Sequence, residues 1–345
     1  MLTASYRKYI LNFKRPAGTS RGVLRTKETW FIVLEENDKF GIGECGILRG
    51  LSADDRPDYE DKLAWACENV HWGLANLYPK LMEFPSIQMG LETAFRSLEG
   101  KHPFSIFESD FSRGNGSIPI NGLIWMGDAA YMKQQIAEKL EEGFNCLKLK
   151  IGAIDFASEL DLLARIRDEF SEREIELRVD ANGAFEPQEA LEKLKRLSQF
   201  QIHSIEQPIK PGQWHEMAGL CEQSPIPIAL DEELIGVFNS EEKTKLMATI
   251  KPQFIILKPS FIGGFQGTDD WISQTALLDV AWWVTSALES NVGLNAISQY
   301  TFTKNSKLPQ GLGTGSLYTN NIPSPLKVHN GRITYDTNLA WEFKI

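Results

Sequence analysis

The pattern of apolar and polar positions divides the chain into two regions. Up to residue 44 the pattern predicts short strands over residues 6–13, 29–35 and 40–44, with a turn at residues 36–38 before the last. Strands joined in this way form an antiparallel meander with a hairpin. Apolar residues then recur at three- and four-residue spacing, which predicts helices over residues 59–76 and 86–99. Residues 1–104 are therefore expected to form an α+β module.

Beyond residue 116 short apolar runs alternate with amphipathic helical segments. The runs cover residues 118–124, 146–151, 175–181, 202–206, 226–232, 254–258, 280–286 and 308–313. Strands alternating with helices form parallel sheets, and eight such units fit a closed, TIM-barrel-like (β/α) barrel better than an open sheet. No G-x-G-x-x-G motif stands between a strand and a helix, which disfavours a dinucleotide-binding fold. We assign residues 105–322 to the barrel, so the predicted class is α/β.

Composition and charge narrow the classes of function. The 345 residues carry a formal net charge of -10, which argues against a nucleic-acid or anionic-membrane partner. No apolar run reaches the length of a membrane span, and residues 1–16 lack the pattern of a signal peptide. Four scattered cysteines, Cys45, Cys67, Cys146 and Cys221, are expected to be buried thiols in a reducing cytoplasm.

Charged residues recur at the carboxyl end of successive predicted strands. Lys148 and Lys150 lie two residues apart on one face of the strand at residues 146–151. The next four strands end near Asp180, Glu206, Asp231 and Lys258, at intervals of 30, 26, 25 and 27 residues from Lys150 onward. Each interval is about one βα unit, so the side chains are expected at one rim of the barrel. Active sites of such barrels are built at that rim.

The order of charges predicts a metal site. Three carboxylates at one rim repel one another unless a cation neutralises them. Carboxylate oxygens suit a hard ion, so Mg²⁺ is expected, with Mn²⁺ as a possible substitute, on Asp180, Glu206 and Asp231. Glu232 alternates off the inward face and is expected to support the ligands instead. The predicted partner is a small-molecule carboxylate substrate.

Two lysines flanking this site suit removal of a proton α to a carboxylate. A catalytic lysine must be able to lose its proton, and a second ammonium, a divalent ion and partial burial all favour that. We assign Lys150, nearer the rim, as the base. Lys148 is expected to tune that base and to orient the carboxylate. Lys258, on the opposite side, completes the predicted catalytic set.

The motif series K-x-K, D-A-N, E-Q-P, D-E and a lysine on the sixth strand resembles the enolase superfamily in its muconate-lactonising branch. This resemblance implies an enolase-type barrel, an N-terminal α+β capping domain over residues 1–104, and a tail over residues 323–345 that returns to the cap. The segment 46–52 is either an ordinary cap loop or a lid. Its Leu51 is a candidate substrate contact, and its Arg49 a candidate partner for an acid.

Within that branch, several residues resemble the o-succinylbenzoate synthases of menaquinone biosynthesis. They are Asn121 with Gly122, Arg178, and the pattern Ser286-x-x-Glu289-Ser290. The resemblance implies substrate contacts from Arg178, Asn182, Ser286, Glu289 and Ser290. It further implies syn dehydration of 2-succinyl-6-hydroxy-2,4-cyclohexadiene-1-carboxylate, in which Lys150 moves the proton and Lys258 stabilises the enediolate.

Alternatives remain open at this point. No histidine stands at the end of a predicted strand, so a mandelate-racemase-like dyad is disfavoured. Residues 311–317 hold no acid, which disfavours a dipeptide epimerase. An N-acylamino acid racemase, with Lys150 and Lys258 as opposed acid–base groups, is compatible with the motifs, as are other racemases and cycloisomerases. A metal-binding barrel without catalysis is a more remote alternative, and monomer and homo-oligomer are both compatible with the sequence.

Overall fold

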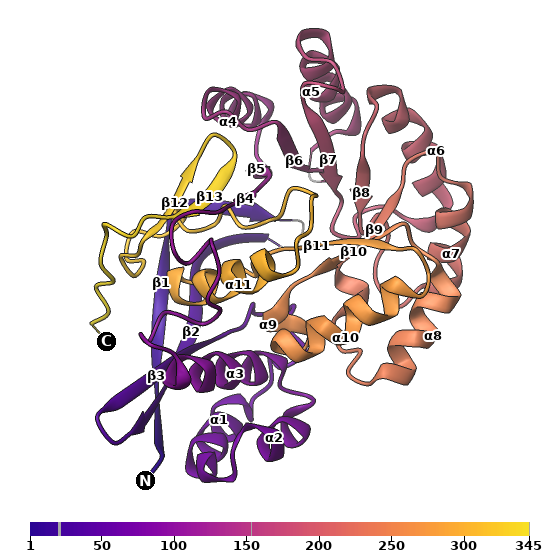
Figure 1. The fold of residues 1–345 in the computed structure, drawn as a ribbon. Coiled ribbons are helices and arrows are strands. Elements are labelled where there is room, and N and C mark those ends of the chain that lie inside the picture. The colour runs from indigo at the N-terminus through magenta and orange to yellow at the C-terminus, as the bar shows by residue number, and fades with distance from the viewer. Residues whose placement is uncertain (20–21, 153, 345) are drawn as a thin grey trace.

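A three-stranded antiparallel sheet forms the first domain, the cap, which Figure 1 shows beside the barrel. The computed structural model describes residues 1–19, 22–152 and 154–344. The sheet consists of β1 (Thr3–Thr19), β2 (Gly22–Glu36) and β3 (Lys39–Gly46). The predicted hairpin between β2 and β3 is confirmed, with Asn37 in the left-handed region at φ 56°. β1 and β2 are longer than predicted and continue their pairing from Glu35 to Gly22.

Small residues bring one helix into direct contact with this sheet. The predicted helix at 86–99 is confirmed as α3 (Pro85–Glu99), which packs on β3. A Cβ at Gly43 would lie 1.8 Å from the carbonyl oxygen of Gly90, so only glycine permits this approach. The core between sheet and helices includes Trp30, Ile32 and Leu91.

The single helix predicted over residues 59–76 is wrong. The chain instead forms short pieces: α1 (Tyr59–Glu68), the 3₁₀ turn η1 (Val70–Trp72), α2 (Leu74–Leu77) and the 3₁₀ turn η2 (Tyr78–Leu81). Gly73, with a φ of 74°, interrupts the helical backbone between η1 and α2.

The second domain is a parallel barrel. Among the described residues its sheet has the order β11-β10-β9-β8-β7-β6-β5, and neighbouring strands are parallel. The strands are β5 (Gly122–Ile124), β6 (Cys146–Lys150), β7 (Glu176–Asp180), β8 (Ser204–Glu206), β9 (Ile228–Leu230), β10 (Phe254–Leu257) and β11 (Ala281–Val284). This order follows the chain, as the alternating pattern predicts, and confirms the predicted fold class.

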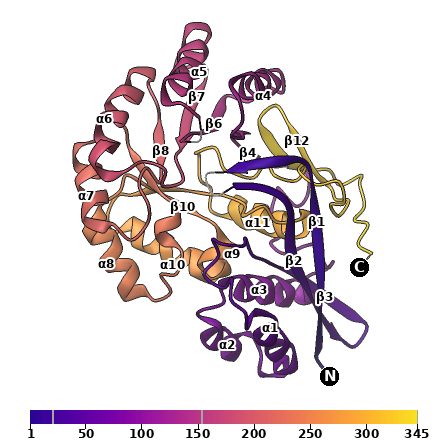
Figure 2. The ribbon, with the colours of Figure 1, turned by 180° about the vertical axis from the view of Figure 1, so that it is seen from behind.

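Helices cover the outside of these strands, as Figure 2 shows for α5 to α8. Aliphatic residues that alternate along the strands, such as Leu147, Val179 and Ile205, are fully buried in the core that the helices share. The helical segments are α4 (Ala129–Glu141), α5 (Phe156–Glu169), α6 (Pro187–Leu197), η3 (Ser198–Phe200), α7 (Trp214–Gln223), η4 (Glu232–Leu234), α8 (Ser240–Ile250), α9 (Pro259–Ile262), α10 (Gly264–Ala276) and α11 (Asn291–Thr303).

Two of the eight predicted strands differ from the prediction. Residues 118–124 divide into β4 (Ser117–Pro119), which leaves the barrel and pairs with β13, and β5. Residues 308–313 form no regular strand. Gln310 and Gly311 instead make isolated parallel bridges to Ile120 and Thr285, so this segment links the first and last strands and closes the barrel. In the part of the chain that the structure describes, the barrel therefore consists of seven strands and a bridging segment.

The C-terminal segment lies against the cap. β12 (Leu326–His329) and β13 (Arg332–Tyr335) form a small sheet with β4, drawn in yellow and purple in Figure 1. Further on, Trp341 stacks on Phe104 with ring centroids 4.0 Å apart, and Phe343 contacts Phe31 of β2 at 5.7 Å. The division at residues 104 and 322 stays a prediction, and Ile345 lies outside the described residues.

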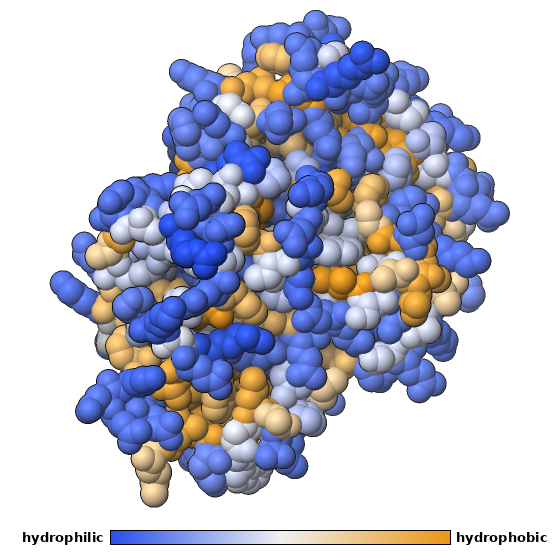
Figure 3. Space-filling model, viewed as in Figure 1, coloured by the Kyte–Doolittle hydropathy of each residue, from blue (hydrophilic) through white to orange (hydrophobic). Residues whose placement is uncertain are grey.

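The surface adds little to these assignments. Hydrophilic side chains cover most of the face drawn in Figure 3, with apolar residues between them. In the described part of the chain, no helix has both the length and the apolar character needed to cross a membrane. All four cysteines are buried and free, as predicted.

One buried carboxylate connects the cap to the barrel. Glu92 of α3 accepts hydrogen bonds from the backbone N–H groups of Phe265 (2.5 Å) and Gln266 (3.1 Å). These are among the first N–H groups of α10, which have no partner within their own helix. Burial raises the pKa of Glu92 to about 7, although the two N–H groups act in the opposite direction.

This raised pKa predicts a specific dependence of stability on pH. Between about pH 4.5 and pH 7 the folded protein binds more protons at Glu92 than the unfolded chain, so stability falls as pH rises through this window. Glu92→Gln removes this titrating group. As pH rises through the window, the free energy of unfolding of the variant should fall by about 1–3 kcal/mol less than that of the wild type. Urea denaturation at pH 5 and pH 7.5 measures both slopes. Parallel profiles for the two proteins would contradict this assignment.

Candidate active site

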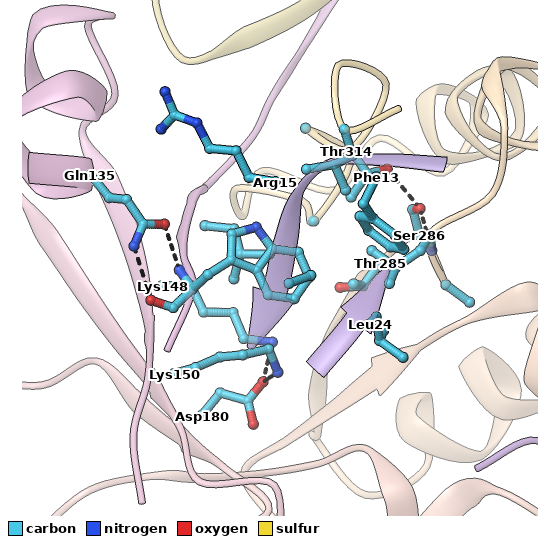
Figure 4. A pocket seen from close by; sticks show the side chains of 18 of the residues that line it. Phe13, Arg15, Leu24, Gln135, Lys148, Lys150, Asp180, Thr285, Ser286 and Thr314 are labelled. Atoms are coloured by element: carbon cyan, nitrogen blue, oxygen red, sulfur yellow. Dashed lines mark hydrogen bonds and ion pairs between the residues drawn. The ribbon is translucent and has the colours of Figure 1, made fainter. Parts of the chain in front are cut away.

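A cavity of about 510 Å³ lies at the carboxyl ends of the barrel strands, beneath the end of the β1–β2 hairpin. Figure 4 shows Lys148 and Lys150 converging on Asp180 on one side, with Ser286 and Thr314 on another. The apolar part of the lining comes from both domains and includes Phe13, Leu24, Leu48, Leu51, Trp125 and Phe261. The cap thus contributes residues to a cavity whose floor belongs to the barrel.

Strand register brings the predicted rim residues to one level. Lys150 of β6 pairs with Asp180 of β7, and Asp180 pairs with Glu206 of β8. Asp231 follows β9 directly, and Lys258 follows β10. The even spacing along the chain therefore corresponds to a continuous row of charged side chains around the rim, in the order that the sequence predicts.

These side chains form a closely paired set of charges. Asp180 Oδ2 lies 2.9 Å from Nζ of both Lys148 and Lys150. Lys148 also contacts Glu206, and Lys258 contacts Asp231. The side chains of the three carboxylates are at most 2% exposed. Three cations thus face three anions in a region almost without water, where an unbalanced charge would be costly.

The pKa values follow from burial and from these pairs. Burial acts to raise the pKa of Asp180, but Lys148 and Lys150 outweigh it and hold that pKa well below its usual range. Burial lowers the pKa of Lys148, but Asp180, Glu206 and Asp231 outweigh this and raise it. Lys148 therefore stays an ammonium, which suits its predicted role beside the base. Burial lowers the pKa of Lys258, but the charges of Asp231 and Glu206 outweigh this effect. The pKa of Lys258 is therefore raised.

Glu206 is the group that these lysines leave least satisfied. Its Oε1 is buried and has no hydrogen-bond partner among the described residues. Burial and the neighbouring charges of Asp180 and Asp231 raise its pKa well above the usual value. A buried carboxylate that has one oxygen without a partner and lies next to two other carboxylates indicates a place that a cation would fill.

The donor set fits Mg²⁺ by its chemistry. All three predicted ligands offer carboxylate oxygens, the donors that a hard divalent ion prefers. In residues 1–19, 22–152 and 154–344, no three acidic, histidine or cysteine side chains lie in an arrangement that could hold a metal ion, and Asp180 and Asp231 are paired with lysines. From the chemistry of these donors we propose Asp180, Glu206 and Asp231 as the metal ligands.

Residues just beyond the strands orient the base. Asn182, with a φ of 45°, accepts a hydrogen bond from Lys150 Nζ (2.7 Å) and donates one to Glu232 Oε1 (3.0 Å). Gln207, with a φ of 40°, accepts from the N–H of Asp231 at 3.2 Å. A left-handed backbone at non-glycine residues is uncommon and clusters at functional sites. Glu232 thus supports the site indirectly, as its place in the strand pattern predicts.

The predicted substrate contacts divide into two groups. Asn182, Ser286 and Leu51 line the cavity. Arg178, Glu289 and Ser290 are at most 1% exposed and lie outside the lining. This placement does not support direct substrate contact by these three residues.

Each of these buried residues binds protein groups instead. Arg178 lies deeper in the barrel, where it donates to Glu176 (2.7 Å) and to the carbonyl oxygen of Pro309 (2.9 Å). Ser290 caps α11 and binds Glu44 of the cap. Glu289 accepts from Ser286 and from a serine of α9, so it positions a cavity residue rather than lining the cavity.

Sequence patterns did not reveal the contribution of the β1–β2 hairpin. Phe13, Lys14, Arg15 and Leu24 line the cavity, although the predicted strands stopped at residue 13 and resumed at residue 29. Their mixed apolar and basic pattern has no period that marks a site. In the segment 46–52, Arg49 is engaged by Glu28 and Asp55, at 2.5 Å and 2.6 Å, and therefore already has acidic partners.

Comparison with known proteins identifies the family. A model of the enolase C-terminal domain-like family matches residues 131–338. The chain belongs to this family. It is 47% identical to an o-succinylbenzoate synthase of Desulfotalea psychrophila, over 95% of this chain and 97% of that protein. The resemblance inferred from the rim motifs is thereby confirmed.

Solved structures of this enolase-like family agree. The crystal structure of MenC from Desulfotalea psychrophila has a TM-score of 0.86 and 43% identity, covering 96% of this chain and 99% of that one. A muconate lactonizing enzyme from Pseudomonas fluorescens has a TM-score of 0.83 at 20% identity, covering 99% and 96% of the two chains, and shares the fold. An L-Ala-D/L-Glu epimerase of Bacillus subtilis is 26% identical over 57% of this chain and 51% of that protein.

The proposed metal site predicts a ligand-specific change in stability. Mg²⁺ at a 100-fold excess over its Kd should raise the Tm of the metal-free wild type by about 5 °C. Glu206→Gln removes one of the three proposed ligands and should abolish the response to Mg²⁺. Glu232→Gln is the matched control and should keep the response. Differential scanning calorimetry measures all three, and a Mg²⁺ response that survives in Glu206→Gln would rule out this ligand set.

Proposed function

We propose that this chain is an o-succinylbenzoate synthase, which dehydrates 2-succinyl-6-hydroxy-2,4-cyclohexadiene-1-carboxylate to o-succinylbenzoate. The main support is the 47% identity, over 95% of the chain, to a protein of that name. The paired lysines and carboxylates at the floor of the cavity supply chemistry that suits this reaction. We place the reaction in menaquinone biosynthesis and in the cytoplasm.

The cavity suits a small dicarboxylate with an apolar middle. Its floor carries Lys148 and Lys258, which would attract the ring carboxylate, and its walls are largely apolar. At the mouth, Lys14 and Arg15 line the cavity and form no ion pair within the described part of the chain. Their charge would attract the second carboxylate, that of the succinyl side chain.

Lys150 is the proposed proton carrier. Asp180 and Asn182 hold its Nζ at the cavity floor, at 2.9 Å and 2.7 Å. In the neutral form it takes the proton from the carbon next to the ring carboxylate. The C–H bond and then the C–O bond to the hydroxyl break, the ring becomes aromatic, and the same lysine returns the proton to the leaving hydroxyl as water. One base can do both because proton and hydroxyl leave from the same face.

Lys258 and the metal stabilise charge in this scheme. Mg²⁺, or Mn²⁺ in its place, would be held by Asp180, Glu206 and Asp231 and would supply positive charge beside the substrate carboxylate. Lys258 stands across the floor from Lys150 and is paired with Asp231, and its raised pKa keeps it protonated. It therefore acts as a fixed ammonium that favours the negative charge developing on the substrate.

Substitution of the two lysines tests these roles. Lys150→Ala should reduce kcat for the dehydration at least about 1000-fold, since it removes the proton carrier. Lys258→Ala should reduce kcat about 100-fold and leave measurable turnover, because it removes stabilisation only. Loss of the diene absorbance measures both, and Lys245→Ala, an exposed lysine of α8, is the control.

The same variants discriminate the alternatives. An N-acylamino acid racemase needs a lysine on each face, so Lys258→Ala would abolish the racemisation of N-succinyl amino acids. Wild-type protein that exchanges this proton but leaves the diene unchanged would be a racemase and not a synthase. A Lys150→Ala variant with unchanged turnover and unchanged exchange would favour a barrel without catalysis.

A further inference from the structure

A buried polar cluster lies behind the wall of the cavity, outside the reacting groups. Its centre is Glu289, which is 0% exposed. One carboxylate oxygen accepts from Ser260 Oγ (2.6 Å) and the other from Ser286 Oγ (2.8 Å). Ser260 lies two residues after Lys258, and Ser286 lines the cavity. Glu289 therefore fixes the segment that carries Lys258 relative to the cavity wall.

The cap provides a cation next to this carboxylate. Lys27 of β2 is 3% exposed, and its Nζ has no hydrogen-bond partner among the described residues. A Cβ built on Gly46 would lie 2.7 Å from that Nζ and 3.8 Å from Cγ of Glu289. The Lys27 ammonium therefore packs against Gly46, where a larger residue would displace it. Glu289 lies near the same glycine. Burial lowers the pKa of Lys27, and the charges of Glu289 and Glu44 oppose this.

A second carboxylate completes the cluster and is already satisfied. Glu44 of β3 accepts hydrogen bonds from Thr29 Oγ1, from the N–H of Ser290 and from the N–H of Gly293, each at 2.9 Å. A Cβ at Gly293 would lie 2.9 Å from Glu44 Oε2 and 2.7 Å from Cβ of Glu289. The two carboxylates are thus near neighbours. Lys27 is the lysine near both, and their charges favour its ammonium form against the effect of burial.

The place of Lys27 in β2 links this charge to the cavity. Three residues before it, Leu24 lines the cavity, and Gly22 and Val23 complete that end of the strand. Lys27 and Glu289 attract each other across the domain boundary. Lys27 belongs to the β2 arm (residues 22–27) of the cap, whose end lines the cavity, and Glu289 belongs to the barrel turn that positions Ser286. Removing one of two opposite charges that are buried near each other leaves the other without compensation, which costs stability.

We propose that Lys27 is a positioning residue of this enzyme. Its buried side chain lies beside Glu289, the bridge between Ser260 and Ser286, and holds the β2 arm (residues 22–27) on the mouth of the barrel. The catalytic part of this proposal rests on the proposed function. Lys27 touches neither the substrate nor the metal ligands, and it acts through Glu289.

A double-mutant cycle tests the proposal in the full-length protein with Mg²⁺. Lys27→Met leaves two buried carboxylates without a cation, and kcat/KM for the dehydration should fall at least about 30-fold. Glu289→Gln should cost about 10-fold, because the amide keeps only one acceptor for the two serines. The double variant Lys27→Met/Glu289→Gln should regain activity relative to Lys27→Met alone. Lys8→Met, which removes an exposed lysine of the same sheet, should change kcat/KM less than about two-fold.

Hydrogen exchange of backbone amides in residues 22–30 gives a readout that does not need the reaction. Lys27→Met should accelerate it about ten-fold, and Glu289→Gln in the same chain should reverse this. If the wild type does not dehydrate the diene, the proposed function fails, and the exchange cycle still decides the positioning role. If Lys27→Met does not fold, recovery of folding in the double variant supports the proposal. Unchanged exchange and unchanged kcat/KM in Lys27→Met, or effects that simply add in the double variant, would overturn it.

Discussion

The balance of buried charge at the barrel rim is the constraint on which the rest of the structure depends. Asp180, Glu206 and Asp231 lie almost without contact with water, and each would be unstable there as an isolated anion. Lys148, Lys150 and Lys258 supply the compensating charge. The unsatisfied oxygen of Glu206 shows where this compensation is incomplete. The same imbalance that would destabilise an ordinary core suits a site that binds a cation and an anionic substrate.

The cap repeats this arrangement on a smaller scale. Lys27 lies near Glu44 and Glu289, although its Nζ makes no hydrogen bond to either of them among the described residues. Close approach in both the cap and the interface depends on glycines, of which Gly43, Gly46 and Gly293 leave space that a side chain would fill. The enclosed cavity therefore requires both domains: the barrel provides the reactive groups, and the cap provides apolar walls and the means to keep them in place.

Much of the barrel and of its rim could be predicted from the sequence, for a physical reason. A parallel barrel repeats one βα unit, so charged residues at even spacing must recur at one rim, and the pairing of Lys150 with Asp180 and of Asp180 with Glu206 follows. The division of residues 118–124 into two strands could not be predicted from the neighbouring sequence. It depends on the pairing of β4 with β13, which lies more than 200 residues away. The bridging segment at Gln310 likewise depends on partners distant in sequence.

The predicted substrate contacts show most clearly what could not be predicted from the sequence. Glu289 and Ser290 stand next to a cavity residue in the chain, yet their side chains turn toward Ser260 and Glu44. Arg178 shares a face of β7 with Asp180 but lies two residues deeper, against Pro309. Side-chain direction at a strand end is set by packing between domains, which a single sequence does not encode locally. For the same reason the role of Lys27 was visible only in three dimensions.

A crystal structure with Mn²⁺ and o-succinylbenzoate would locate both the metal ligands and the substrate site, because the anomalous signal of manganese identifies the ion without assumptions. We expect one strong anomalous peak within about 2.5 Å of oxygens of Asp180, Glu206 and Asp231. We also expect a product carboxylate between that ion and the two lysines Lys148 and Lys258. An ion bound elsewhere, for example on Glu232 and Glu233, or a product molecule outside the cavity, would contradict the proposed site.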